Sequence, residues 1–435
     1  MATAKILYKS FYWKILQFFV SFAVNLLYVR LFQSSLSAEF YSLLYLLSLA
    51  TSFFTFGLDI GLNYFLAAKK LSSKNALWMA LLVSVLAVLV TVLLAFLWYD
   101  RLVGFSGMGL HHVLLFTLLQ VSGNLLAIFS GPLYNAHGQT HLSTFIAVLF
   151  NFFLLVLGLA WARSYQGEEL VRRLFLAYFS CSFLQGLFIF GYAYLLYGRE
   201  GTPGQGGAGL GDILKFSLAA FAVNFIFFAG GRVTVYLLPG HLSAADLGNY
   251  IQAFKLVEYI TVFASFLYYP LMSIVTRQSD DNKIRVMVLT LVRLSNTAVL
   301  VLSVVLVCTG WFLFPLVFGP SFGYMYKIFV MLTPGLFASC ASSFFTAYFF
   351  GRGRLRNNFI SAFILLAAGL FFYFLFVPMG VLTGAACGFS VASLLSLGYD
   401  VVVFHDIQPF PIKAALFVRP ADIEMVRLFI KRLSL

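Results

Sequence analysis

The sequence contains little charge, since only 10% of its 435 residues are Asp, Glu, Lys or Arg. In a soluble domain about a quarter of the residues are charged, and they cover the water-facing surface. Here hydrophobic residues make up 62% and aromatic residues 18%, and the mean hydropathy is +0.95. These proportions exclude an ordinary soluble domain and predict an all-α integral membrane protein.

Motifs of enzyme chemistry are missing as well: the sequence has no HExxH, no GxSxG and no paired acidic motif. The histidine pairs His111–His112 and His137–His141 have no nearby Cys, Asp or Glu at the spacing of a metal site. Four cysteines lie inside apolar runs without a CxxC pair and are predicted to be buried, inert thiols: Cys181, Cys308, Cys340 and Cys387. We therefore expect no enzyme activity, no metal and no cofactor.

Acidic residues are scarce relative to basic ones, 15 against 28, which gives a net charge of +13. A basic balance can indicate nucleic-acid binding, but here the basic residues lie between apolar runs and no nucleic-acid-reading motif is present. The rule that basic loops stay on the cytoplasmic side of a membrane explains most of them. We expect no nucleic-acid partner.

Apolar runs long enough to cross a bilayer, which takes about twenty residues, recur along the chain. Twelve candidate spans are predicted: Phe11 to Leu31, Phe40 to Leu66, Ala76 to Trp98, His112 to Leu133, Leu142 to Trp161, Leu174 to Tyr197, Ile213 to Leu238, Leu247 to Val275, Met287 to Phe314, Tyr324 to Phe350, Phe359 to Val377, and Gly380 to Phe404. Only the residues around Pro378 separate the last two. Lys and Arg gather in alternate loops, so we expect a multi-pass protein of the cell inner membrane with both termini cytoplasmic.

A Gly-rich segment, residues 201–212, divides the chain into two halves of six spans each. It is predicted to be a cytoplasmic linker between an N-terminal bundle, 1–200, and a C-terminal bundle, 213–406. The fragment Phe-Ala-Val-Asn occurs once per half, at residues 22–25 and 221–224, which favours a parallel internal repeat with a binding site between the halves. The basic tail, 407–435, contains a segment from Ile423 to Leu435 that fits either an amphipathic helix on the cytoplasmic leaflet or a disordered tail.

Charged residues inside the predicted spans are costly and mark candidate functional positions. Lys14 and Arg293 lie near cytoplasmic span ends, where their side chains can reach the membrane surface. Arg30 and Arg232 lie toward the outer ends of the first and seventh spans, and both surface-reaching and functional roles are open for them.

Three further charges lie deeper. Lys255 and Glu258 are three residues apart on one helix face and can pair with each other. Asp59 lies between Gly57 and Gly61, which allow close helix approach, and it either accepts hydrogen bonds between helices or faces a cavity. Because most of the charges within the spans are basic, they predict a cationic cavity for an anionic phosphate or pyrophosphate head group.

The C-terminal half carries a series of short motifs: Phe-Pro-Leu-Val-Phe-Gly-Pro-Ser-Phe at 314–322, Leu-Thr-Pro-Gly at 332–335, Tyr-Phe-Phe-Gly-Arg-Gly at 348–353, and Val-Pro-Met-Gly-Val-Leu-Thr-Gly-Ala-Ala at 377–386. This series resembles the Wzx-like O-antigen and exopolysaccharide flippases of the MOP superfamily. The resemblance implies two six-helix bundles around a central cavity that work by alternating access. The chain departs from that family at Gly231, where many members have an acidic residue, and it lacks a basic residue near Tyr64.

The sequence therefore predicts a flippase for polyprenyl-pyrophosphate-linked oligosaccharide. Six residues are its cavity candidates: Arg30, Arg232, Lys255, Glu258, Asp59 and Lys14. The alternative is a MATE-type multidrug or cation antiporter, for which only Asp59 and Glu258 supply acidic contacts. A membrane polymerase or ligase is disfavoured because no loop is long enough to carry a catalytic site. Membrane lipids and polysaccharide polymerase or assembly proteins are the further expected partners, and we expect a monomer.

Overall fold

The computed structural model describes residues 2–99, 109–199, 209–239, 241–277 and 280–411, together with Arg419 and Asp422. All of the regular secondary structure in these residues is helical. The elements are α1 (Ala2–Phe54), α2 (Leu58–Ala67), α3 (Ser73–Leu97), α5 (Leu110–Ala136), α6 (Thr140–Ser164), α7 (Gly167–Tyr197), α8 (Leu210–Leu237), α9 (Ala244–Arg277), α10 (Asp281–Phe318), η1 (Pro320–Phe322), α11 (Met325–Gly351), α12 (Leu355–Phe376), η2 (Val377–Met379) and α13 (Val381–Ile407).

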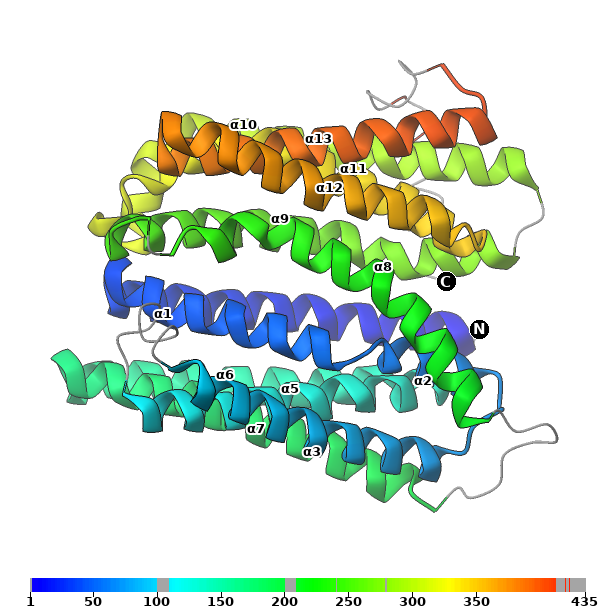
Figure 1. The fold of residues 1–435 in the computed structure, drawn as a ribbon, viewed down its shortest axis with the longest axis horizontal. Helices are drawn as coiled ribbons and strands as arrows, with labels where there is room; N and C mark the ends of the chain where they lie inside the picture. Colours follow the sequence, from blue (N-terminus) through cyan, green and yellow to red (C-terminus); the bar gives the residue numbers. More distant parts are fainter. Residues whose placement is uncertain are drawn as a thin grey trace. The chain divides into compact units, whose positions relative to one another are not determined.

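The predicted number of crossings agrees with these helices. Eleven helices of the described part are long and apolar enough to span a membrane. One of them, α1, contains a non-helical residue, Gln33 with φ 60° and ψ −171°, which joins two helical arms. Figure 1 shows this first helix, in blue, running out and folding back. Counting both arms brings eleven spans to the twelve expected from the sequence.

The boundary near Pro378 is also settled by the structure. α12 ends at Phe376, a single turn of 3₁₀-helix covers Val377–Met379, and α13 begins at Val381. Gly380 has a φ of +158° at the junction, which glycine adopts without strain. A side chain at Gly384 would overlap the carbonyl of Phe376, so the turn is tight. The last two predicted spans are therefore separate helices, as expected.

The described chain forms two compact units, Met1–Phe225 (unit 1) and Ile226–Leu435 (unit 2). Their boundary falls inside α8, so the first half of this continuous helix packs in unit 1 and the second half in unit 2. α8 begins at Leu210, before the end of the segment predicted as a linker, and residues 201–208 of that segment lie outside the described residues. The predicted domain limits stay predictions.

In unit 1 the predicted second span is interrupted. α1 ends at Phe54 and α2 begins at Leu58, with Phe56 at φ 45° and Gly57 at φ 66° between them. A side chain at Gly57 would overlap the carbonyl of Ser217 on α8, and one at Gly61 would overlap the Ser217 hydroxyl. The expected close helix approach at these glycines is confirmed, and α8 is the partner.

A Gly57→Ala variant is therefore expected to be destabilised, because alanine is strained at this φ and its Cβ meets the α8 backbone. The expected loss in the free energy of unfolding is about 1–3 kcal/mol. Thermal unfolding of the purified protein measures it. Gly131→Ala, in the helix α5 with open space around the new Cβ, is the matched control and should leave the midpoint unchanged or higher. Equal midpoints for the two variants would contradict this account of the α2–α8 contact.

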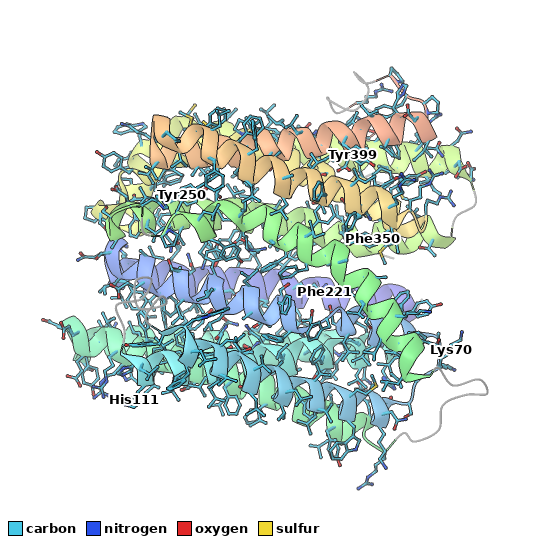
Figure 2. All side chains as sticks on the ribbon, viewed as in Figure 1. Lys70, His111, Phe221, Tyr250, Phe350 and Tyr399 are labelled. Carbon is cyan, nitrogen blue, oxygen red and sulfur yellow. The ribbon has the colours of Figure 1, made fainter. Side chains whose placement is uncertain are left out.

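Aromatic packing and close glycine contacts hold the rest of unit 1. Tyr28 and Phe40 are buried in a ring cluster, and the Tyr28 hydroxyl donates to the carbonyl of Leu174 at 3.2 Å. α5 and α7 approach through Gly123 and Gly186, whose backbones leave no room for a side chain. Lys70 and His111 lie at opposite ends of the unit 1 helices (Figure 2). Unit 1 is thus a tightly packed bundle of membrane helices.

In unit 2, polar side chains fix the ends of the helices. The Asn249 amide donates to the carbonyl of Ser321 at 3.0 Å, and its carbonyl accepts the backbone N–H of Met325 at 2.9 Å. This anchors the start of α9 to the start of α11. Ser390 on α13 likewise donates to the carbonyl of Met331 at 2.6 Å. The two Asn249 hydrogen bonds hold α9, the helix that carries Lys255 and Glu258, against η1 and the start of α11.

Candidate functional site

The second half of α8 is held on one face by its neighbours in unit 2. The Tyr250 hydroxyl donates to Thr234 at 2.7 Å, and the Tyr373 hydroxyl donates to the carbonyl of Leu237 at 2.9 Å. A Cβ on Gly230 would meet the backbone of Leu366 at 3.0 Å, so α8 and α12 are in close contact there. At 100° per residue, the opposite face of α8 carries residues 228, 232 and 236. Tyr250, on α9, is labelled in Figure 2.

On that opposite face, Arg232 forms an ion pair with Glu258 of α9. The distance between Arg232 Nη2 and Glu258 Oε1 is 2.6 Å, and the two side chains are 27% and 28% exposed. The Arg232 guanidinium also lies 4.1 Å from the ring centroid of Phe228, one turn earlier on α8. The pair is therefore neither fully buried nor fully solvated.

Lys255 completes a group of three charged residues. It lies three residues before Glu258 on α9, so the two share one helix face, as the sequence predicted. Its ammonium group lies 5.8 Å from the ring centroid of Tyr259. We call Arg232, Lys255 and Glu258 the α8–α9 charge cluster, whose formal charges sum to +1.

All three members of the cluster were predicted from the sequence, but the contact between Arg232 and Glu258 was not. Lys255 was the expected partner of Glu258, because neighbours on one helix are visible in the sequence and partners on another helix are not. The only available signal was that two oppositely charged residues lay in consecutive predicted spans. An intrahelical Lys255–Glu258 pair stays a prediction.

The other three candidates belong to unit 1. Lys14 and Arg30 are exposed on the first arm of α1, and Arg30 lies three residues before the turn at Gln33. Asp59 is half-buried in the first turn of α2. The described contacts thus bring together Arg232 and Glu258, next to Lys255, within unit 2. A role for the unit 1 residues in substrate binding stays a prediction.

Asp400 was missed by the sequence analysis although it lies inside the last predicted span. Its side chain on α13 is fully buried and accepts a hydrogen bond from the hydroxyl of Ser342 on α11. α13 also contacts α12 through a 2.9 Å hydrogen bond between the hydroxyls of Ser396 and Ser361. A lone acidic residue in a span was the signal that would have found Asp400.

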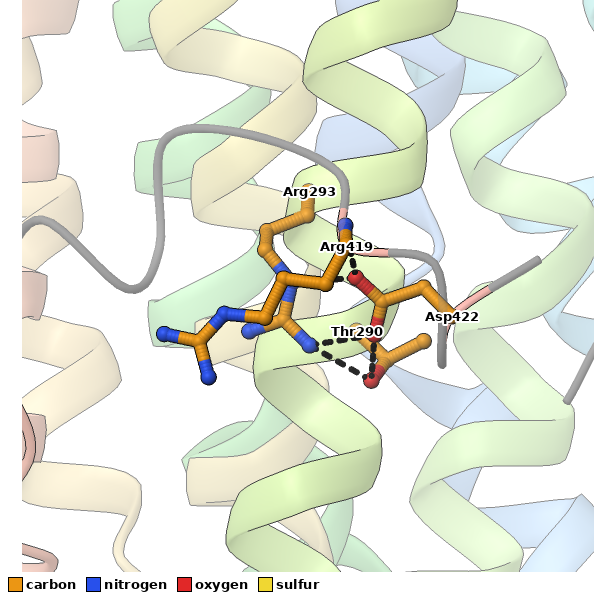
Figure 3. A network of polar contacts seen from close by, with 4 residues as sticks. All are labelled: Thr290, Arg293, Arg419 and Asp422. Carbon is orange, nitrogen blue, oxygen red and sulfur yellow. Dashed lines mark hydrogen bonds and ion pairs between the residues drawn. The ribbon is translucent and has the colours of Figure 1, made fainter. Parts of the chain in front are cut away.

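Arg293 on α10 is buried in the protein, whereas its place near a span end suggested a side chain that extends to the membrane surface. Its side chain is 6% exposed and pairs with Asp422, which is 4% exposed. The Arg293 Nε–H donates to Asp422 Oδ2 at 2.7 Å, and an Nη2–H donates to Thr290 at 2.9 Å. The backbone N–H of Arg419 donates to the same Asp422 carboxylate at 2.8 Å (Figure 3). Arg293 is buried because the chain beyond α13 supplies its counter-ion.

These hydrogen bonds, those from Arg293 first, lower the pKa of Asp422 to about 2. The carboxylate is therefore charged at any physiological pH. Residues 423–435, predicted to form an amphipathic helix or a disordered tail, lie outside the described residues.

In comparisons with known proteins, no family model and no curated protein matches the chain. Solved structures match it over most of its length. An inward-facing MATE multidrug resistance transporter of the MOP superfamily has a TM-score of 0.69 at 15% identity, covering 89% of this chain and 95% of that one. A eukaryotic MATE transporter has a TM-score of 0.68 at 12% identity, covering 95% and 98%.

The lipid II flippase MurJ, in an inward closed conformation, has a TM-score of 0.66 at 14% identity, covering 94% of this chain and 88% of that one. At these identities the likeness establishes the fold, and the resemblance to Wzx-like flippases stays a prediction. The predicted class, an all-α membrane protein, is confirmed. The chain has the multi-pass helical fold shared by MATE transporters and the MurJ flippase.

Proposed function

We propose that this protein flips a polyprenyl-pyrophosphate-linked oligosaccharide across the cell inner membrane by alternating access, for O-antigen or exopolysaccharide biosynthesis. The observation that carries the proposal is the α8–α9 charge cluster. It places two cations and one anion within apolar helices, and both members of its ion pair remain about a quarter exposed. Charge inside a span is costly and is retained where it is used.

The positive net charge of the cluster favours an anionic substrate. Its net charge of +1 is neutralised when a phosphate oxygen binds, whereas a cationic drug would raise it further. Arg is also well suited to phosphate because its planar guanidinium donates two parallel hydrogen bonds to two oxygens. The lipid-linked part of the proposal draws on the MurJ likeness, since that neighbour is a lipid II flippase. The polysaccharide part comes from the sequence motifs between residues 314 and 386.

The alternative is a MATE-type multidrug or cation antiporter, which the MATE likeness favours. In that case Glu258 would bind the cation, and the cation would displace Arg232 from Glu258. The flippase would therefore bind its substrate at Arg232, whereas the antiporter would bind it at Glu258 of the same ion pair. The charge that the substrate carries separates them.

Reconstitution of the purified protein into liposomes tests the proposal. We expect it to move a polyprenyl-pyrophosphate-linked oligosaccharide between leaflets, measured as lectin access to the sugar, at a rate well above that of protein-free liposomes. The same liposomes should not accumulate ethidium. Ethidium transport without movement of the lipid-linked sugar would reject the flippase and establish the antiporter.

A further inference from the structure

Two of the three Arg–carboxylate pairs in the described part of unit 2 have their Arg inside a predicted span, and these two differ in burial. The Arg293–Asp422 pair is 6% and 4% exposed and is reinforced by Thr290 and by the backbone of Arg419. The Arg232–Glu258 pair is 27% and 28% exposed. A buried, fully hydrogen-bonded pair resists exchange because separating it leaves two desolvated charges. The Arg232–Glu258 pair is accessible to an incoming group, which can take the place of one partner.

We propose that Glu258 is a resident counter-anion of Arg232, which the anionic group of the substrate has to displace, and that Lys255 keeps the displaced carboxylate in place. The proposal rests on the proposed function, because it assumes that the substrate is an anion. Glu258 is then a selectivity residue: a group that offers one weak negative charge does not replace it, whereas a diphosphate does.

Arg232 keeps its position when Glu258 leaves. Its guanidinium lies 4.1 Å from the centroid of the Phe228 ring on the same helix. A cation over an aromatic face is attracted by the ring, and Arg is the cation most often found in this arrangement. The ring and the fixed helix register therefore hold the guanidinium ready for the incoming phosphate oxygens.

The displaced carboxylate also keeps a cation beside it. Lys255 precedes Glu258 by three residues on α9, so the two side chains lie on the same face of that helix. Rotation of the Glu258 side chain toward Lys255 leaves no bare negative charge inside the span. The exchange needs no proton, and it makes substrate release favourable because Glu258 returns to Arg232 when the substrate departs.

Calorimetric titration of the purified full-length protein with inorganic pyrophosphate tests this exchange. We expect the Glu258→Gln variant to bind pyrophosphate about tenfold more tightly than the natural protein, because the competing carboxylate is gone. Glu258→Asp keeps the charge on a shorter side chain and should bind pyrophosphate with intermediate affinity. If the Gln variant does not fold, the affinity of the Asp variant tests the exchange. Arg232→Gln should abolish binding, and Lys255→Gln should weaken it.

The matched control is Glu169→Gln, which removes the carboxylate of an exposed pair with Arg173 in unit 1 and should leave the affinity unchanged. Equal or weaker binding by both Glu258 variants, with Arg232-dependent binding intact in the natural protein, would overturn the exchange while leaving the proposed function standing. Loss of pyrophosphate binding in every form, together with ethidium binding that requires Glu258, would instead overturn the proposed function and the exchange with it.

Discussion

An Asp422→Asn variant is expected to lose most of the stability that the tail contributes to unit 2. Asn cannot neutralise Arg293, whose side chain is only 6% exposed. Removing one partner of a buried pair costs about 3–5 kcal/mol because the remaining charge is left unpaired in a poorly solvated place. The loss is limited if the tail undocks and water reaches Arg293. Thermal unfolding should show a lower midpoint, and hydrogen exchange at the Arg419 amide should accelerate.

Two variants make this result specific. Glu169→Gln breaks an exposed pair, 40% and 60% exposed, and is expected to change the free energy of unfolding by less than about 1 kcal/mol. Replacing Arg293 and Asp422 together with Met and Leu should recover much of the loss, since no charge is then left unpaired. A midpoint in Asp422→Asn equal to that of the natural protein would show that the pair does not hold the tail.

The same pair predicts a direction of pH dependence. The pKa of Asp422 is lowered to about 2 in the folded protein, from an ordinary value near 3.8. A carboxyl whose pKa is lowered by folding binds its proton more readily in the unfolded chain. Its contribution to the stability of the folded protein is therefore complete at pH values above the ordinary pKa. Protection of the Arg419 amide should therefore hold above about pH 5 and fall as the pH drops from about 4 to about 2.

Replacing Arg232 with glutamine is the second change with a large expected effect. It removes the proposed phosphate contact and leaves Glu258 without its 2.6 Å partner. Truncating one partner of a hydrogen-bonded charge pair typically costs about 2–5 kcal/mol, so the rate of sugar-lipid flipping should fall by more than tenfold. Initial rates of lectin access in liposomes measure it.

Arg173→Gln is the control, because Arg173 also pairs with a glutamate at 2.8 Å, but on the exposed surface of unit 1. It should flip the lipid at the natural rate. The amount of each variant recovered in the membrane fraction separates a transport defect from misfolding. Natural flipping rates in Arg232→Gln would remove the cluster from the substrate path.

Most of the fold could be predicted from the sequence, because the thickness of the bilayer sets the length of each apolar run. The separation of the last two spans at Pro378 was predicted from three residues and is confirmed by the turn at Gly380. The break before α2 was not predicted. Phe56 and Gly57 interrupt the helix within the predicted span, and the close contact that excludes a side chain at Gly57 comes from Ser217, far away in the sequence.

The candidate site was predicted as a list of residues but not as an arrangement. Arg232 and Glu258 were chosen because charge is rare in a span, whereas their contact depends on how α8 and α9 pack. The burial of Arg293 was not predicted for the same reason, since its counter-ion Asp422 is 129 residues away. Periodicity along one helix shows which residues share a face, and it contains no information about which distant segment covers that face.

We propose that the α8–α9 charge cluster selects a lipid-linked substrate by its diphosphate. The most direct test compares two lipids with the same oligosaccharide and the same polyprenyl chain, joined by a diphosphate in one and by a neutral linkage in the other. Their initial flipping rates are measured in the same proteoliposomes. We expect that only the diphosphate lipid moves faster than in protein-free liposomes. Equal rates for the two lipids would contradict it.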